Sequence, residues 1–217
     1  MLKIEQFVFN IFVENTYLIY DDETKEALIL DPGCFDEYEL STLTDFINKN
    51  NLKVKYLVNT HCHLDHILGN LKLKKIMPEV PLLYPKEDEF LVETLPKQLM
   101  AFNLEPEESI KADQYISEDL KINLGNIEGT FIFTPGHTPG EYCLYFENEK
   151  VLFSGDVLFK ENIGRTDLWG GNYDILIESI TNKLLVLPDD VNVYPGHGEK
   201  TTIGYERRNN LFLNKYH

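Results

Sequence analysis

Short apolar runs alternate with polar stretches along this chain of 217 residues, and many have the length and the β-branched or aromatic content of strands. The runs predict strands at residues 7–9, 17–20, 27–30, 54–59, 81–84, 131–133, 142–146, 151–153 and 192–194. Apolar residues at helical spacing predict helices at about residues 36–50, 68–76, 173–186 and 203–213. Residues 86–128 are acidic and unevenly patterned, so we expect short helices and loops there. Strands with helices packed outside them indicate a layered α/β architecture.

No internal repeat, low-complexity tract or Gly/Ser-rich linker interrupts the pattern. A chain of this length is compatible with one large domain. We therefore expect a single domain over residues 1–217.

Five of the six histidines fall in three short motifs. The motifs occupy residues 60–66, 134–140 and 194–198, and Asp156 ends the sequence Ser-Gly-Asp between the last two. His217, the remaining histidine, is interpreted as a solvated chain end. Imidazole and carboxylate together are ligands of borderline divalent metals such as zinc, so the clustering indicates a metal site.

Each histidine motif follows directly after a predicted strand, and so does Asp156. In open α/β sheets, functional groups gather at the carboxyl ends of the strands. The side chains of the three motifs and of Asp156 are therefore expected to converge.

A first ion is expected at His61 and His63, which are two residues apart and project to the same side of an extended chain. His137 is the candidate third ligand. Cys62, between the two histidines, would point the other way and is expected not to bind the ion.

A second ion is suggested by Asp65 and His66, which belong to the following turn and cannot all crowd the first ion. His197 would complete this site, and the two oxygens of Asp156 could bridge both ions. Seven ligands leave room for a water between the ions, as a catalytic site requires. We expect two divalent ions, with zinc as the first choice and iron or manganese as alternatives. Asp156, as the bridge, and Asp65, which could aim the activated water, are the candidate catalytic residues.

Composition excludes several other classes of function. The net charge of −16 disfavours nucleic-acid binding, because phosphate backbones require Lys and Arg. No apolar stretch approaches the ~20 residues of a membrane span. The N-terminus has no basic start followed by an apolar signal core, so a cytoplasmic location is expected. Three cysteines without repeated spacing are expected to be buried thiols rather than a disulfide framework.

The sequence His61-Cys62-His63-Leu64-Asp65-His66 resembles the HxHxDH signature of the metallo-β-lactamase superfamily. His137, Asp156 and His197 are similar to its remaining ligands in order and context, and the resemblance covers essentially the whole chain. It implies an αββα four-layer sandwich with a dinuclear site at one edge. It also implies the ligand sets: His61, His63 and His137 for the first metal, Asp65, His66 and His197 for the second, and Asp156 for the bridge.

Within this superfamily, the chain most resembles short glyoxalase II-like hydrolases, through residues 134–140, 154–159, 163–167 and 201–207. That resemblance implies hydrolysis of a small-molecule thioester by a metal-activated water. Full glyoxalase II enzymes hydrolyse S-lactoylglutathione and carry a C-terminal helical extension that holds the glutathione. This chain ends at residue 217, soon after His197, so we expect that extension to be absent.

Other readings remain open. Persulfide dioxygenases also resemble this sequence, and their single iron would be held by His61, His137 and Asp156. Two histidines and one carboxylate with open positions suit non-haem iron. A non-catalytic metal-binding or scaffold protein of the same fold is a third reading. Arg165 is expected either to pair with Asp167 or to contact an anionic substrate. The pattern does not indicate the oligomeric state.

Overall fold

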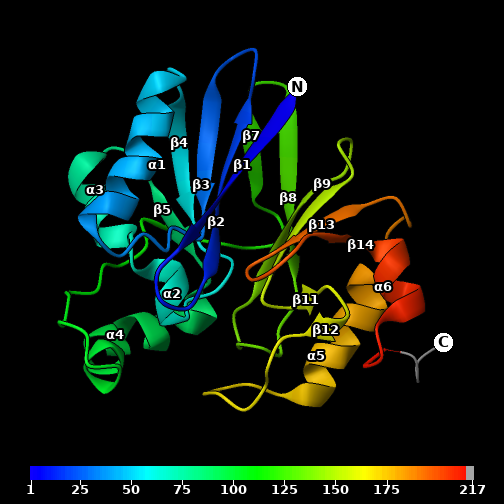
Figure 1. The fold of residues 1–217 in the computed structure, drawn as a ribbon. Helices are drawn as coiled ribbons and strands as arrows, with labels where there is room; N and C mark the ends of the chain where they lie inside the picture. The colour runs from blue at the N-terminus through cyan, green and yellow to red at the C-terminus, as the bar shows by residue number, and fades with distance from the viewer. Residues whose placement is uncertain (214–217) are drawn as a thin grey trace. The chain divides into compact units, whose positions relative to one another are not determined.

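The computed structural model describes residues 1–213 and divides into two compact units. Unit 1 comprises Met1–Ile116 and Asn123–Ile127, and unit 2 comprises Ser117–Ile122 and the chain from Glu128 onward. Figure 1 gives the element labels used below. His217, interpreted above as a solvated end, lies outside the described residues. The single domain expected over residues 1–217 stays a prediction.

Unit 1 contains a six-stranded mixed sheet in the order β1-β2-β3-β4-β5-β6. The first three strands pair antiparallel, and the later neighbours pair parallel. The strands are β1 (Leu2–Phe9), β2 (Glu14–Asp21), β3 (Glu26–Leu30), β4 (Lys53–Val58), β5 (Leu82–Tyr84) and β6 (Gln114–Tyr115). The helices are α1 (Glu37–Lys49), α2 (Leu64–Ile67), α3 (Asn70–Ile76), the 3₁₀ turn η1 (Lys86–Asp88) and α4 (Glu89–Ala101).

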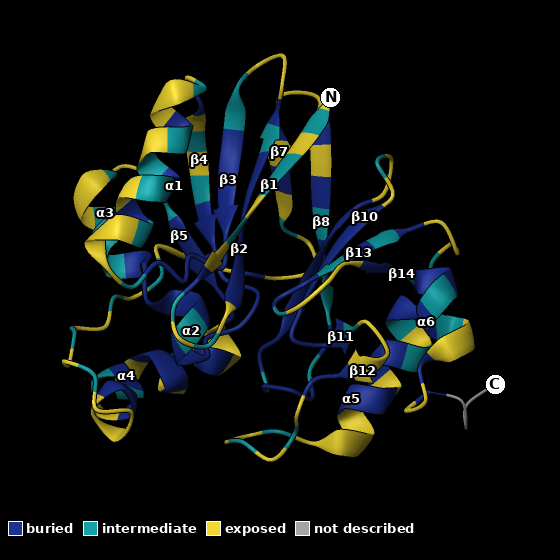
Figure 2. Ribbon diagram, viewed as in Figure 1, coloured by how far each residue is buried: buried dark blue, intermediate teal, exposed yellow. Residues whose placement is uncertain are grey.

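Helix α1 forms where the apolar spacing predicted it. Asp36 caps its N-terminus by accepting a hydrogen bond from the backbone N–H of Glu39 at 2.8 Å. Its buried face, Leu40, Leu43 and Ile47, belongs to the same apolar cluster as residues of the sheet. Figure 2 shows this buried stripe against an exposed opposite face.

The second sheet lies mainly in unit 2 and has the order β14-β13-β10-β9-β8-β7. It is also mixed, because β10 pairs parallel with β13 and antiparallel with β9. Its strands are β7 (Lys121–Leu124), β8 (Ile127–Phe133), β9 (Tyr142–Phe146), β10 (Val151–Gly155), β13 (Asn192–Pro195) and β14 (Thr201–Thr202). A small hairpin pairs β11 (Leu158–Phe159) with β12 (Asn162–Ile163). The helices are α5 (Tyr173–Ser179), the π-helical turn η2 (Ile180–Leu184) and α6 (Ile203–Asn209).

Two expectations about elements were wrong. The acidic stretch at residues 86–128 contains a 13-residue helix, α4, with Pro96 inside it, as well as the strands β6 and β7. Helix α6 ends at Asn209 rather than at Leu213. The turn expected to carry Asp65 and His66 is a single turn of helix, α2.

All three cysteines are free and buried, which confirms the expectation of thiols without a disulfide framework. Within residues 1–213, no helix combines the length and the apolar character needed to cross a membrane.

The loop between β8 and β9 packs tightly against α5. The backbone N–H of Asn172 donates to the Gly136 carbonyl at 2.8 Å, and the Ser179 hydroxyl donates to the Pro135 carbonyl at 2.7 Å. Gly136 has φ +135°, and a Cβ there would lie 2.3 Å from the backbone nitrogen of Leu176. Only glycine fits this position, because both the backbone angle and the close approach exclude a side chain.

Replacing Gly136 with alanine should therefore destabilise unit 2 by about 2–5 kcal/mol, the sum of backbone strain and overpacking. Gly198 is a matched control, since it also has positive φ (+75°) but open space around its Cβ position. Gly198→Ala should cost only about 1–2 kcal/mol, from the backbone angle alone. Chemical denaturation of both variants measures the difference, and equal losses would contradict the packing argument.

Candidate metal centre

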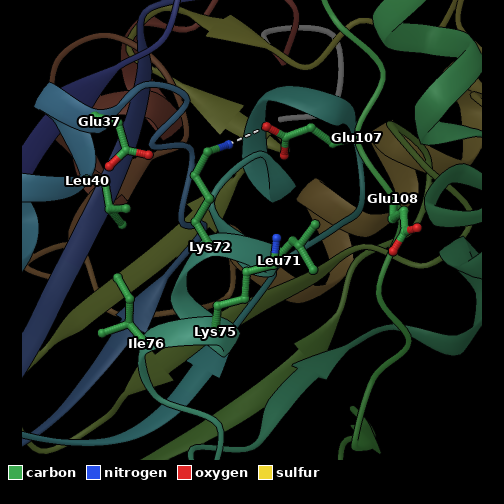
Figure 3. A pocket seen from close by; sticks show the side chains of 8 residues that line it. All are labelled: Glu37, Leu40, Leu71, Lys72, Lys75, Ile76, Glu107 and Glu108. Atoms are coloured by element: carbon green, nitrogen blue, oxygen red, sulfur yellow. Dashed lines mark hydrogen bonds and ion pairs between the residues drawn. The ribbon is translucent and has the colours of Figure 1, made fainter.

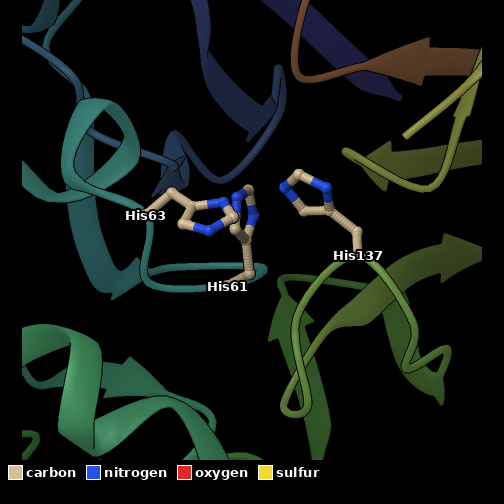
Figure 4. Close-up of side chains that lie close together, drawn as sticks. All are labelled: His61, His63 and His137. Carbon is tan, nitrogen blue, oxygen red and sulfur yellow. The ribbon is translucent and has the colours of Figure 1, made fainter. Parts of the chain in front are cut away.

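The ligand-type residues of unit 1 follow β4 without a break. The chain leaves the sheet after Val58 and carries His61 and His63 on the loop that leads into α2. Figure 4 shows these two rings on that loop. The ring centroids of His61 and His63 are 4.9 Å apart, and those of His61 and His66 are 4.1 Å apart. All three rings are buried, so the loop after β4 and helix α2 hold three imidazoles away from water.

Outer partners orient two of these rings through their Nδ1 atoms. The Thr60 hydroxyl lies 3.1 Å from His61 Nδ1, and a carboxylate oxygen of Asp31 lies 3.3 Å from His66 Nδ1. Asp31 also accepts hydrogen bonds from the Thr60 backbone N–H at 2.7 Å and from the Thr60 hydroxyl at 2.8 Å. Metal-binding histidines typically have such a partner on the nitrogen that does not bind metal. The arrangement therefore assigns the Nε2 atoms to a cation.

Two asparagines hold the backbone of α2. Asn59 donates its side-chain amide to the His66 carbonyl at 2.7 Å. Asn10, in the turn between β1 and β2, donates to the carbonyls of Asp65 and Gly33, both at 3.0 Å. The positions of Asp65 and His66 are thus set by side-chain hydrogen bonds as well as by one helical turn.

In unit 2, Asp156 follows β10 and lies between two histidines. One oxygen of Asp156, Oδ2, is 3.5 Å from His137 Nε2 and 3.6 Å from His197 Nε2. His137 Nδ1 lies 2.7 Å from the Arg165 carbonyl, which can only accept a hydrogen bond. His137 therefore carries its proton on Nδ1 and presents the Nε2 lone pair. Figure 4 shows His137 on the loop after β8.

Unit 2 also fixes the backbone of Asp156. The buried carboxylate of Glu141 accepts a hydrogen bond from the Asp156 N–H at 2.6 Å. Gly164 packs so closely that a Cβ there would lie 1.9 Å from the Asp156 carbonyl oxygen. The backbone of Asp156, the bridging candidate, is therefore fixed at its N–H by Glu141 and at its carbonyl by the close packing of Gly164.

These distances suit ligands of a metal ion better than direct hydrogen bonds. Contacts of 3.5 and 3.6 Å to Asp156, and 3.7 Å between Asp65 Oδ2 and His66 Nε2, exceed hydrogen-bond length. Two ligands of a tetrahedral zinc ion, each at about 2.1 Å, lie roughly 3.4 Å apart. The donor set and its spacing fit divalent metal, and the histidine and aspartate clusters are consistent with a dinuclear site. The residues that could hold a metal ion are His61, His63, Asp65 and His66 in unit 1, and His137, Asp156 and His197 in unit 2.

Cys62 is buried between its two histidine neighbours, and its backbone N–H donates to Asp88 at 3.1 Å. Burial raises the pKa of the Cys62 thiol well above its usual range. A thiol that keeps its proton is a poor metal ligand, because the thiolate is the binding form.

Arg165 pairs with Asp167, the first of the two roles expected for it. Its Nε and Nη2 atoms donate to the two carboxylate oxygens of Asp167 at 2.7 and 2.9 Å. The hydrogen bond from this guanidinium lowers the pKa of Asp167 to about 2. Both side chains are exposed, so the stabilisation is small. The Arg165 carbonyl, rather than its charge, makes the contact with His137.

A separate hollow of about 650 Å³ lies in unit 1, along α1 and α3. Figure 3 shows Lys72 and Glu107 joined by an ion pair across this hollow. Its lining contains none of the seven ligand-type residues. The hollow therefore has no part in the metal chemistry.

Sequence reasoning missed the residues that support the ligands: Asp31, Thr60 and Glu141. Asp31 lies just after β3, where strand-end acids are expected to matter, and its positive φ of +49° marks it as unusual. Thr60 precedes the first histidine directly. Glu141 has no local signal, because its role depends on a contact with Asp156, which is distant in sequence.

Comparison with known proteins agrees with this geometry. The model of the metallo-β-lactamase superfamily matches residues 10–197. The protein named hydroxyacylglutathione hydrolase GloC from Haemophilus influenzae is 40% identical over 216 residues, which cover 98% of this chain and 99% of that protein.

Two solved structures are similar over nearly their whole length. The B3 metallo-β-lactamase BLEG-1 has a TM-score of 0.87 and 34% identity, covering 98% of this chain and 99% of that one. The protein TTHA1623, solved in a di-iron-bound form, has a TM-score of 0.84 and 29% identity. The match covers 96% of this chain and 100% of that one. The predicted metallo-β-lactamase-like αββα fold class is confirmed, with two mixed sheets flanked by helices.

The family match and the histidine-rich clusters support the general class expected from the sequence, a metal-dependent hydrolase. The chain belongs to the metallo-β-lactamase superfamily.

Proposed function

We propose that this chain is a dinuclear metal-dependent thioester hydrolase similar to hydroxyacylglutathione hydrolases. The observation that carries the proposal is the 40% identity to a hydroxyacylglutathione hydrolase over nearly the full length of both chains. The presence of Asp65, His66 and His197 beside the other ligand candidates supports a second metal position. The family match runs through both units, which supports treating residues 1–217 as one domain.

In this proposal, the seven ligand candidates hold two divalent ions. The first ion is assigned to His61, His63 and His137. The second is assigned to Asp65, His66 and His197, and the carboxylate of Asp156 is shared. Zinc is the expected metal, and the di-iron form of the similar protein TTHA1623 keeps iron as an alternative.

Bound divalent ions would polarise the thioester carbonyl and make water acidic enough to attack it near neutral pH. Asp65 is assigned to accept a hydrogen bond from the attacking water and so to aim it. The carbon–sulfur bond breaks, the carboxylic acid keeps the oxygen of water, and the thiol leaves with a proton. Imidazoles whose outer nitrogens are already bonded need little reorganisation during this reaction.

The alternative activity is persulfide oxidation, in which His61, His137 and Asp156 would hold a single iron and dioxygen would be the oxidant. The cytoplasmic location expected from the sequence also stays a prediction.

Replacing Asp156 with alanine should lower activity by at least about 100-fold, more than the typical loss of metal affinity for an outer partner. The metal content should fall from two ions per chain to one or fewer, because a shared ligand is lost. Elemental analysis and thioester hydrolysis measure the two effects. Asp167→Ala, a change at an exposed aspartate of the same unit, is the matched control and should keep both metals. Two retained ions and full activity in Asp156→Ala would refute the bridging role.

A substrate panel separates hydrolase from dioxygenase. Protein purified without added metal should contain two ions per chain and cleave acylglutathione or acyl-coenzyme A thioesters. Chelation should abolish this turnover, and zinc should restore it. A β-lactam belongs in the panel because BLEG-1 is similar in structure. One iron per chain with oxygen uptake on glutathione persulfide would overturn the proposal in favour of the dioxygenase.

A further inference from the structure

His197 is the most exposed of the five histidines among the ligand candidates, and it lies on a surface loop. Its side chain is 28% exposed, whereas the other four histidines are buried. The loop runs from the end of β13 to the start of β14, and residues 198–200 within it are exposed. A ligand on such a loop binds a cation well only if the surrounding structure holds the loop in place.

The hairpin of β11 and β12 lies against this loop. The ring of Phe159 meets the ring of His197 edge-on, with centroids 6.4 Å apart. Lys160 Nζ lies 2.5 Å from the Glu199 carboxylate, an exposed ion pair that contributes little by itself. The two-residue turn of the hairpin contains Glu161, whose φ of +58° is rare outside glycine. Such a turn persists only where other contacts hold it.

The carboxylate of Glu206, in α6, is fully buried and joins the turn of the hairpin to the end of the His197 loop. Its Oε2 atom accepts a hydrogen bond from the Glu161 N–H at 2.9 Å. Its Oε1 atom accepts from the hydroxyl of Thr201, the first residue of β14, at 2.5 Å. The buried Asn210 donates to Glu206 Oε2 at 2.9 Å and to the Asn162 carbonyl at 3.0 Å, so it holds the other side of the same turn.

We infer that Glu206 is a positioning residue for His197, because it fixes both the hairpin that contacts the ring and the β14 end of the loop that carries it. The inference rests on the proposed function, since it treats His197 as a ligand of the second ion. Removing the carboxylate would leave three donors without their acceptor, which favours movement of the segments that carry them. Any effect of Glu206 on metal binding therefore passes through His197.

The three contacts require the shape of the Glu206 side chain rather than its charge. The amide oxygen of Glu206→Gln can accept from the Glu161 N–H and from Asn210. Its amide nitrogen can donate to Thr201 Oγ1, because a hydroxyl accepts as well as donates. Glu206→Gln should therefore keep the contacts that Glu206→Ala removes.

Zinc titration of the metal-free full chain tests the positioning role. The wild type should bind two ions, and Glu206→Ala should bind the second about 10-fold more weakly, at the lower end of the loss typical for residues that orient ligands. The first ion, whose candidate ligands do not include His197, should bind with unchanged affinity. Glu206→Gln should bind both ions as the wild type does. Equal weakening of both ions, or unchanged binding of the second, in Glu206→Ala would overturn the inference.

Leu184→Ala is the matched control for a general loss of stability. Leu184 is fully buried in an apolar cluster of unit 2, so its truncation is strongly destabilising. The variant should lower the denaturation midpoint and still bind the second ion as the wild type does. A loss of the second ion as large as in Glu206→Ala would refute a specific role for Glu206. If Glu206→Ala does not fold, Thr201→Val carries the same test, because it keeps the shape of the side chain and removes one contact.

Hydrogen exchange of the metal-free chain measures the same contacts without any ion. The amides of residues 196–202 should exchange faster in Glu206→Ala than in the wild type, and at the wild-type rate in Glu206→Gln. Unchanged exchange in Glu206→Ala would contradict the positioning role. Wild-type protein that binds fewer than two zinc ions would refute the dinuclear proposal instead, while the exchange rates would still decide whether Glu206 holds the loop.

Discussion

The burial of polar ligands away from water is the constraint on which this structure depends. His61, His66 and His137 are at most 2% exposed, and Asp156 is 8% exposed. Burying such groups costs free energy unless each has a partner. Two kinds of partner offset this free energy for the histidine rings. One ring nitrogen contacts an outer polar group and the other, as we propose, binds a metal ion.

The outer hydrogen bonds explain the residues around the ligands. Thr60 and Asp31 serve unit 1, and the Arg165 carbonyl and Glu141 serve unit 2. Asp31, Glu141 and Arg165 lie far in sequence from the residues they contact, so their contacts fix the ligand loops to the rest of the fold. Because the loops are already ordered, metal binding and catalysis do not require the free energy of ordering them.

Positive backbone φ angles occur at the same places, strained at Asp31 and accommodated by glycine at Gly136 and Gly155. Asp31 has φ +49°, and Gly136 and Gly155 have φ +135° and +49° beside the ligands His137 and Asp156. Strained backbone persists only where surrounding contacts determine it, and it concentrates at functional sites. Here the contacts are the hydrogen bond from the Thr16 hydroxyl to the Asp31 carbonyl and the close packing of α5 against Gly136. The tight turns allow each strand to end and present a ligand within a few residues.

The strands that lead to the ligands could be predicted because they are apolar runs followed directly by histidine or aspartate. The helix Glu89–Ala101 could not, because Pro96 and scattered acids obscure its periodicity, and tertiary packing of Leu91, Leu95 and Leu99 decides it. The contacts that the supporting residues make could not be predicted. Asp31 accepts hydrogen bonds from Thr60 across 29 positions of sequence, and Glu141 accepts one from the Asp156 N–H across 15 positions.

X-ray diffraction from crystals grown with zinc, recorded on both sides of the zinc absorption edge, tests the central claim most directly. The account predicts two anomalous peaks per chain, both within bonding distance of the Asp156 carboxylate. One peak should contact His61, His63 and His137, and the other should contact Asp65, His66 and His197. No peak at these residues, or a single peak that leaves Asp65 and His197 without metal, would contradict it.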